Sequence, residues 1–270
     1  LESSVYYFQN FHGRIDLLNA NLILLHKPRF GQSFLAGSHS FNFMFPLPTY
    51  LPTTFKSVEG VVKYEMNITV KRFGKSDCNF VYPFNVMRVV DLNAFDPPLT
   101  KPVLKVTSKE FSIDFTSKAL YMTAMIPQTG FVPSQVIDIR IQVDNRSMIY
   151  VKYVKISLKK VIAFTSQNPN IQTRELCVTE AQVYCGDVPA HKKKSFLKYL
   201  KVPLLSPNIN NCDIIRLDYE IHVKAKTVGV TRSPVLKIPI QIGSIPLMSE
   251  GHVDYELAMG EPTFLRGLQI

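Results

Sequence analysis

The chain has 270 residues and a formal net charge of +10, and 46% of its residues are hydrophobic. This content excludes an intrinsically disordered chain, and the length suffices for one large core or two ordinary ones. The positive charge favours contact with anionic surfaces such as phospholipid headgroups, acidic peptides or nucleic acid. No helix-turn-helix pattern, zinc-finger spacing or aromatic-basic RNA motif is present, so we expect no nucleic-acid partner.

The cysteine content and the termini bear on the cellular compartment. Four cysteines are too few for a disulfide scaffold, and none forms a Cys-x-x-Cys pair, which favours a reducing compartment without a zinc site. Residues 1–11 lack the pattern of a signal peptide, and no uncharged apolar run reaches the roughly 18 residues that a membrane helix needs. The simplest expectation is a soluble cytoplasmic protein without a cofactor.

The first half of the chain alternates apolar and polar residues in several short stretches, which is the period of a half-buried β-strand. Residues 46–55 contain three prolines and predict an extended connection. Three further prolines in residues 91–102 predict an interdomain linker. The strands expected before this linker lie in residues 1–30 (one strand and a loop), 38–45, 60–70 and 80–90.

The alternation continues beyond the linker and is clearest in residues 215–226, where six apolar residues alternate with six polar ones. The returning strand contains Pro239, which has no backbone N–H, so we expect this strand at a sheet edge. The expected strands are 103–106, 111–115, 119–126, 137–143, 150–164, 176–184, 215–226 and 236–242. Short strands separated by turns, with no helical period, predict an all-β protein with two β-sandwich domains.

Several motifs resemble signatures of the arrestin-domain-containing proteins, the α-arrestins, in the order and at the spacing of that family. They are Leu35-Ala-Gly-Ser-His-Ser-Phe-Asn-Phe-Met-Phe-Pro-Leu-Pro48, Leu51-Pro-Thr-Thr-Phe55, Gly60-Val-Val-Lys-Tyr64, Asp91-Leu-Asn93, Val202-Pro-Leu-Leu-Ser206, Cys212-Asp-Ile-Ile215, Tyr219 and Ile238-Pro-Ile-Gln-Ile-Gly-Ser-Ile-Pro-Leu247. The resemblance implies two arrestin-type, immunoglobulin-like sandwiches. The domains expected are an N-like domain in 1–90, incomplete at its start, the linker in 91–102, a C-like domain in 103–247 and the start of a tail in 248–270.

The resemblance also implies a function without chemistry of its own. Family members are adaptors in endocytosis and ubiquitin-dependent sorting, on the cytoplasmic side of the plasma membrane and endosomes. They bridge membrane-protein cargo to HECT-type ubiquitin ligases, whose WW domains bind Pro-Pro-x-Tyr motifs in the adaptor's tail. No such motif occurs here, since Pro97-Pro98-Leu99 is followed by Thr100. We therefore expect a fragment that lacks both ends of the family's chain. The alternatives are a retromer-type coat subunit and a cargo- or membrane-binding scaffold that recruits no ligase.

Two groups of lysines are candidate contacts for anionic phospholipids or acidic cargo tails, the alternative being ordinary solvated surface. Near a charged bilayer each lysine contributes about 1 kcal/mol. One group lies on one expected strand and the other in an expected basic loop: Lys152, Lys155, Lys159 and Lys160, and Lys192, Lys193 and Lys194 with Lys198 and Lys201.

Three further features have alternative interpretations. Cys212 is expected to be either a buried, inert thiol or a redox-responsive one. Asp91, Asn93 and Asp96 are expected either to form turns or to make a polar contact between the domains. The six histidines show no spacing of a catalytic or metal-binding motif, so we expect no enzymatic activity.

Overall fold

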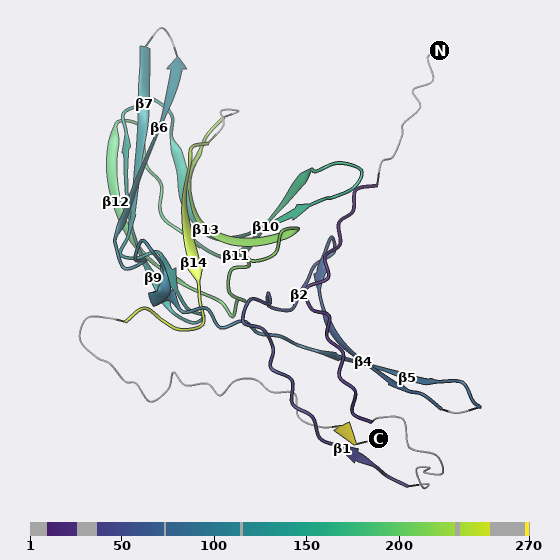
Figure 1. Cartoon of the computed structure of the whole chain (residues 1–270). Helices are drawn as coiled ribbons and strands as arrows, with labels where there is room; N and C mark the ends of the chain where they lie inside the picture. Colours follow the sequence, from purple (N-terminus) through teal and green to yellow (C-terminus); the bar gives the residue numbers. More distant parts are fainter. Residues whose placement is uncertain are drawn as a thin grey trace, which may run out of the picture.

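The computed structural model describes residues 10–25, 37–72, 74–113, 116–229, 233–248 and 268–269 (Figure 1). Apart from one 3-10 turn, every regular element in these residues is a β-strand, which confirms the all-β prediction. The elements are β1 (Ser40–Phe41), β2 (Phe55–Lys56), β3 (Val61–Val62), β4 (Tyr64–Val70), β5 (Cys78–Phe84), the 3-10 turn η1 (Leu92–Ala94), β6 (Val103–Ile113), β7 (Thr116–Ile126), β8 (Gly130–Phe131), β9 (Val136–Asn145), β10 (Val151–Thr165), β11 (Thr173–Tyr184), β12 (Lys192–Lys201), β13 (Ile215–Thr227), β14 (Val235–Ile242) and β15 (Leu268–Gln269).

The carboxy-terminal half is a sandwich of two sheets. One sheet has the strand order β12-β9-β7-β6, and the other has the order β11-β10-β13-β14-β8. The predicted alternation is realised in β9 and β13, where every second side chain is buried between the sheets. Burying one aliphatic side chain of this kind contributes about 1.5–3 kcal/mol, so the inner faces supply the main stabilisation of the sandwich.

Pro239 lies in β14 opposite Glu220 of β13. On the other side of β14, the short strand β8 pairs only with Gln241 and Ile242. Among the described residues the outer side of β14 at Pro239 therefore has no partner strand, as the missing N–H predicts.

Two predicted strands of the second half differ in the structure. The expected strands 103–106 and 111–115 are one continuous strand, β6, which pairs with β7 along its length. The expected basic loop at 192–201 is wrong, because these residues form β12, which pairs with β9. On β12 the half-buried Lys194 and Lys198 share a face with Phe196 and Leu200. A long lysine side chain can cover apolar surface while its ammonium group stays in water, so lysines here obscured the alternation of a strand.

The strands predicted in the first half are mostly shorter in the structure. Only Ser40–Phe41 of the expected strand 38–45 is a strand, paired with β15. The strand expected at 80–90 is Cys78–Phe84, because beyond it the N–H of Val86 donates to the Thr54 hydroxyl instead of to β4. Residues 10–25 are extended but form no strand, and the expected turn at 27–31 lies outside the described residues.

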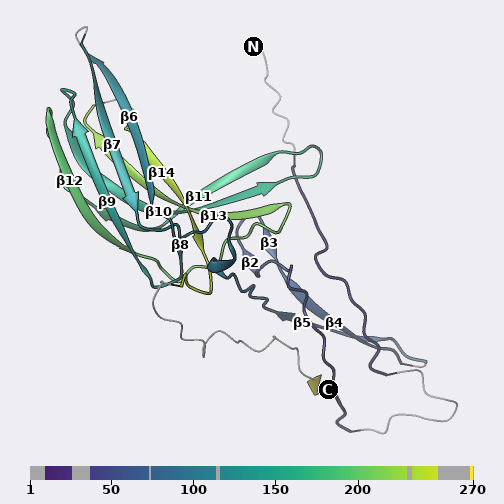
Figure 2. The ribbon, with the colours of Figure 1, turned by 60° about the vertical axis from the view of Figure 1, so that its left-hand side comes forward.

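The amino-terminal half consists of short paired strands that adjoin the sandwich. β2 pairs with β3, and β4 pairs with β5 in a ribbon that leads away from the sandwich (Figures 1 and 2). Five buried residues of this half belong to the same hydrophobic cluster as the sandwich core: Leu51, Phe55, Val62, Tyr64 and Val86. The two halves are therefore joined by a shared core as well as by the chain.

The turn η1 after the first half packs against the loop that follows β14. Leu92 is 1% exposed, and a Cβ at Gly243 would lie 2.5 Å from its Cγ. The same Cβ would lie 2.9 Å from the carbonyl oxygen of Val90. Only a glycine permits this approach of the two backbones.

Polar contacts complete the same junction. The Asp91 carboxylate accepts a hydrogen bond from the backbone N–H of Asn93 at 2.9 Å and so caps the turn. The Asn93 amide donates to the carbonyl oxygen of Pro246 at 2.9 Å, and its own oxygen accepts from the N–H of Met248 at 2.9 Å. For two of the three residues the roles considered are present: Asp91 forms the turn, and Asn93 joins the two halves.

Candidate functional site

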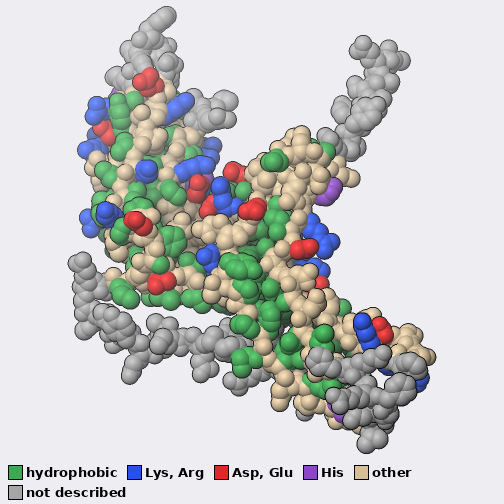
Figure 3. All heavy atoms as spheres, viewed as in Figure 1, with side chains coloured by type: hydrophobic (Ala, Val, Ile, Leu, Met, Phe, Trp, Pro, Cys, Tyr) green, Lys and Arg blue, Asp and Glu red, His purple; other side chains and the backbone are tan. Residues whose placement is uncertain are grey.

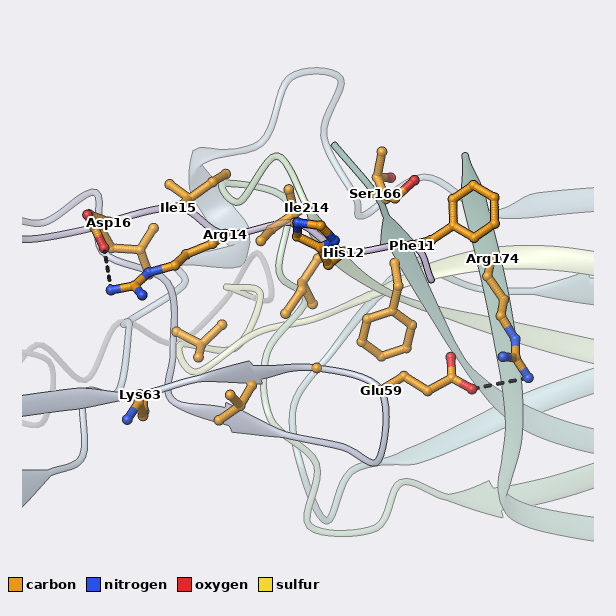
Figure 4. Close-up of a pocket in the computed structure, with 18 of the residues that line it drawn as sticks. Phe11, His12, Arg14, Ile15, Asp16, Glu59, Lys63, Ser166, Arg174 and Ile214 are labelled. Atoms are coloured by element: carbon orange, nitrogen blue, oxygen red, sulfur yellow. Dashed lines mark ion pairs between the residues drawn. The ribbon is translucent and has the colours of Figure 1, made fainter. Parts of the chain in front are cut away.

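A cleft of about 940 Å³ lies where residues 10–18 pass the β2–β3 hairpin and the end of β10 (Figure 4). Its volume falls within the range of about 300–1,000 Å³ that is usual for ligand sites. The walls come from segments far apart in the sequence, and much of the lining is apolar. The aliphatic and aromatic residues at the cleft include Ile15, Leu17, Leu18, Val62, Phe164, Ile214 and Ile215.

The outer wall of the cleft is held by a few backbone contacts. The backbone of His12 pairs with Asn168, with an N–H to carbonyl distance of 3.0 Å, and its carbonyl oxygen also accepts from Gln167. The N–H of Arg14 donates to the side chain of Gln167 at 2.9 Å. Residues 15–18 then run on without a strand partner among the described residues. This wall is an extended chain anchored at one end.

The charged side chains at the rim are paired with one another. Arg174 lies 3.2 Å from Glu59, Arg14 lies 3.5 Å from Asp16, and Lys63 donates to Glu65 at 2.9 Å. Figure 4 shows the first two of these pairs on opposite sides of the opening. Such exposed pairs contribute about 0–1 kcal/mol each to the stability of the fold. Their main effect here is to neutralise the charges at the rim. The rim therefore presents no excess of either sign.

Among the described residues that line the cleft, no serine or cysteine side chain is hydrogen-bonded to a histidine or a carboxylate. The Ser166 hydroxyl donates to the carbonyl oxygen of Asn170 at 2.7 Å and accepts from the N–H of Gln172 at 3.0 Å, so it serves a turn. Across the described residues, no group of three or more His, Cys, Asp or Glu side chains is placed to hold a metal ion. The geometry suits the binding of an apolar or extended partner segment.

The structure separates the four lysines expected to cluster on β10. Lys155 lies opposite Lys224, and Lys159 opposite Glu220, on the outer face of the five-stranded sheet. Lys160 lies on the other face, opposite the buried Tyr219. Its ammonium group is 3.8 Å from Glu180 and 5.9 Å from the ring centre of Phe55, at the junction of the two halves. Lys152 is exposed near the start of β10. The ammonium group of Lys159 donates a hydrogen bond to the Thr179 hydroxyl.

The second group of lysines begins β12. Lys194 forms an ion pair with Asp187 at 2.9 Å, while Lys192 and Lys193 are exposed. The Asp187 pKa is lowered by hydrogen bonds from Tyr150 and Lys194. On the face of the molecule shown in Figure 3, basic side chains are spread over the sandwich and do not form one compact patch. The two predicted groups lie on strands of different sheets, and their contact with anionic lipid or acidic cargo stays a prediction.

Cys212 is half-buried and not in a disulfide, and it lies close enough to Tyr64 to influence the pKa of that phenol. Burial is the larger cause, and together they raise the pKa of Tyr64 to about 12. The redox role considered for Cys212 stays a hypothesis. The other cysteines are also free: Cys78, Cys177 and Cys185.

Sequence reasoning missed two lysines that the strand register brings beside the predicted set. Lys224 lies directly opposite Lys155, and Lys226 lies opposite Tyr153. Both lie on the polar face of the alternating strand β13, and that alternation by itself indicates no site. The register between β10 and β13 is the information that was missing, because no local pattern specifies which residues face each other across two strands.

Comparison with known proteins places both halves in one family. The family described as "Arrestin (or S-antigen), N-terminal domain" matches residues 2–93, and "Arrestin (or S-antigen), C-terminal domain" matches residues 116–247. Arrestin domain-containing protein 4 of Mus musculus is 28% identical over 251 residues, covering 90% of this chain and 58% of the relative. Arrestin domain-containing protein 1 of Homo sapiens is 27% identical over 218 residues, covering 79% of this chain and 48% of the relative. The chain thus spans about half the length of these relatives. No helix within the described residues is long and apolar enough to cross a membrane.

Proposed function

Since this chain belongs to the arrestin-domain-containing family, the α-arrestins, we propose that it is a non-enzymatic adaptor that binds membrane-protein cargo for endocytosis and ubiquitin-dependent sorting. The observation that carries this proposal is the match of the two arrestin domains, in order, over residues 2–93 and 116–247. A cleft with an apolar lining and a charge-balanced rim, without a group placed for chemistry, is consistent with a binding role.

In this proposal the 270 residues are the cargo-binding part, and ligase recruitment depends on a Pro-Pro-x-Tyr motif that they do not contain. A HECT-type ubiquitin ligase would bind that motif through its WW domains. The place of action would be the cytoplasmic side of the plasma membrane and endosomes. The excess of basic residues would favour proximity to anionic phospholipids there.

The test supplies the missing motif artificially. The whole chain is fused at its carboxyl end to a short peptide ending in Pro-Pro-Ala-Tyr, and a matched fusion ends in Pro-Pro-Ala-Ala. Both are expressed in cells, and ubiquitin on surface-labelled membrane proteins is quantified by mass spectrometry. We expect a restricted set of membrane proteins to gain ubiquitin only with the tyrosine-containing fusion.

Two outcomes would overturn the proposal. In the first, the tyrosine-containing fusion binds the ligase and yet no membrane protein gains ubiquitin. In the second, the chain co-purifies stably with coat subunits and shows no effect on cargo, which would favour the retromer-type alternative.

A further inference from the structure

The outer face of the four-stranded sheet is exposed and partly apolar. In Figures 1 and 2 this sheet, β12-β9-β7-β6, lies on the side of the molecule away from the amino-terminal half. Leu197 and Tyr199 of β12 point outward and are 50% and 60% exposed. On the same face, Leu104 and Val106 of β6 are 60% and 62% exposed. An exposed apolar surface with polar residues around it marks a contact with a protein or a membrane.

The charges on this face balance, although the whole chain carries a net charge of +10. Because side chains alternate along a strand, the register assigns as many basic as acidic residues to the outer face. They are Lys193, Lys201 and Arg140, and Asp138, Asp144 and Glu110. The excess of positive charge therefore lies on other surfaces, and a second copy of the chain would meet no net repulsion here.

Two charged residues near the centre of the face lack a counter-charge. Asp138 and Arg140 both point outward from β9, and neither forms an ion pair with a described residue. Their positions are about 7 Å apart along the strand. On β12, Leu197 lies directly opposite Arg140, and Tyr199 lies directly opposite Asp138. The four side chains form a square with its charged residues on β9 and its apolar residues on β12.

This square is complementary to itself under a two-fold rotation. An axis between two facing sheets, perpendicular to β9 at Ile139, turns residue 140 of one copy onto residue 138 of the other. Arg140 of each copy then meets Asp138 of the other, and Leu197 meets Tyr199 in the same way. A two-fold interface needs a patch of this kind, in which each residue contacts its counterpart in both directions. Sheets that pack face to face lie about 10 Å apart, a distance that these side chains span together.

We propose that two copies of this chain form a two-fold dimer through the outer faces of their four-stranded sheets, centred on Asp138 and Arg140. A face without net charge does not attract an anionic membrane, and an acidic peptide would place a like charge against Asp138. The cleft beside residues 10–18 stays open in this dimer, because the dimer face points away from the amino-terminal half. The dimer does not depend on the proposed function. If that function holds, two linked copies would bind clustered cargo more tightly than one.

Sedimentation equilibrium of the whole chain measures the dimer. We expect a Kd of about 1–100 µM, as for an interface of modest size, and weaker association as salt is raised. Arg140→Asp places like charges opposite each other twice in each dimer and should raise the Kd at least about tenfold. Asp138→Arg should have the same effect with the opposite sign of charge.

The matched control is Lys193→Glu, which changes the net charge as much as Arg140→Asp does, at an exposed position of the same face. Lys193 lies opposite Asp144, near the end of β9, and the two-fold rotation carries this position beyond the start of β9. Lys193→Glu should therefore dimerise with the wild-type Kd.

Mixing the two charge-reversed variants gives a sharper test. Arg140→Asp has two carboxylates at the centre of the face and Asp138→Arg has two guanidinium groups, so each variant repels itself and matches the other. An equimolar mixture should form heterodimers with about the wild-type affinity, and a double variant with both changes should form homodimers again. If circular dichroism shows that a reversed variant is misfolded, Leu197→Ser with Tyr199→Ser replaces it and should also raise the Kd at least about tenfold.

The inference is overturned if the wild-type chain stays monomeric up to about 100 µM, or if Arg140→Asp dimerises as tightly as the wild type. It is also overturned if the mixture and the double variant stay monomeric. Larger assemblies that form equally with the wild type and with Arg140→Asp would place the contact on another face and overturn it as well.

Discussion

The contact of Gly243 with Leu92 gives a measurable prediction about how the two halves are joined. In Gly243→Ala the new Cβ would lie 2.5 Å and 2.7 Å from Cγ and Cδ2 of Leu92, well inside van der Waals contact. It would also lie 2.9 Å from the Val90 carbonyl oxygen, which already accepts hydrogen bonds from Ser244 and Ile245. The backbone at this point has little room to move, and overpacking of this kind costs about 1–3 kcal/mol. For a chain of this size, a loss of about 2 kcal/mol lowers the Tm by about 4–8 °C.

Thermal unfolding followed by circular dichroism measures this loss. Gly186→Ala is the matched control, because the nearest atom to its new Cβ lies at 3.8 Å and its effect should be close to zero. Leu92→Ala should by itself cost about 2–5 kcal/mol through the cavity it leaves. The double variant should cost less than the sum, because the cavity accommodates the new methyl group. If the Tm of Gly243→Ala equals that of Gly186→Ala and of the wild-type protein, the close packing of η1 against the loop after β14 is refuted.

Three further predictions concern the sandwich, the tyrosines and the thiols. Asn145 is fully buried and its amide donates to three backbone carbonyl groups, so Asn145→Ala should lower the free energy of unfolding by about 2–4 kcal/mol in a urea titration; a change below about 1 kcal/mol would contradict these contacts. Burial raises the pKa values of Tyr64 and Tyr219 from 10.0 to about 12. Since unfolded tyrosines ionise near 10, the stability from these raised pKa values is complete below that pH and is lost as the pH rises toward 12. Ultraviolet titration follows the ionisation of the 12 tyrosines. Tyr64→Phe and Tyr219→Phe should each remove one tyrosine from the group that ionises at the highest pH. Loss of a tyrosine that ionises at lower pH would contradict the burial of these two side chains. Cys177 is exposed, whereas burial raises the pKa of Cys185, so alkylation followed by peptide mass spectrometry should find Cys177 modified first; the reverse order would disprove this burial pattern.

Local alternation predicted the long strands of the second half well. β9 and β13 have one apolar and one polar face in the sequence, and the structure buries the apolar face in each. The same reasoning was less successful for residues 38–45, where only Ser40–Phe41 is a strand. Alternation shows that a segment can form a two-faced strand, but a strand also needs a neighbour for its backbone hydrogen bonds. That neighbour is not encoded in the segment itself.

For the candidate binding surfaces, too, the sequence predicts the residue types and the tertiary structure determines their positions. The abundance of lysine and the arrestin-type motifs can be read in the sequence, and they predict a basic protein that acts by binding. The position of each lysine relative to the other strands cannot be read in the sequence. Lys160 lies beside Glu180 and Phe55 at the junction of the halves, and Lys155 faces Lys224 across two strands.

The sequence by itself determined the all-β class, the faces of the long strands and the family, because each depends on residues that are near one another along the chain. The tertiary structure decided the strand status of 192–201, the close approach at Gly243 and the placement of Leu197 and Tyr199 beside the charged residues of β9. These depend on which distant segments become neighbours, and on the register in which they pair. A shift of one residue in that register would turn every side chain of a strand to the other face, so the surfaces that can bind a partner are fixed only when the sheets assemble.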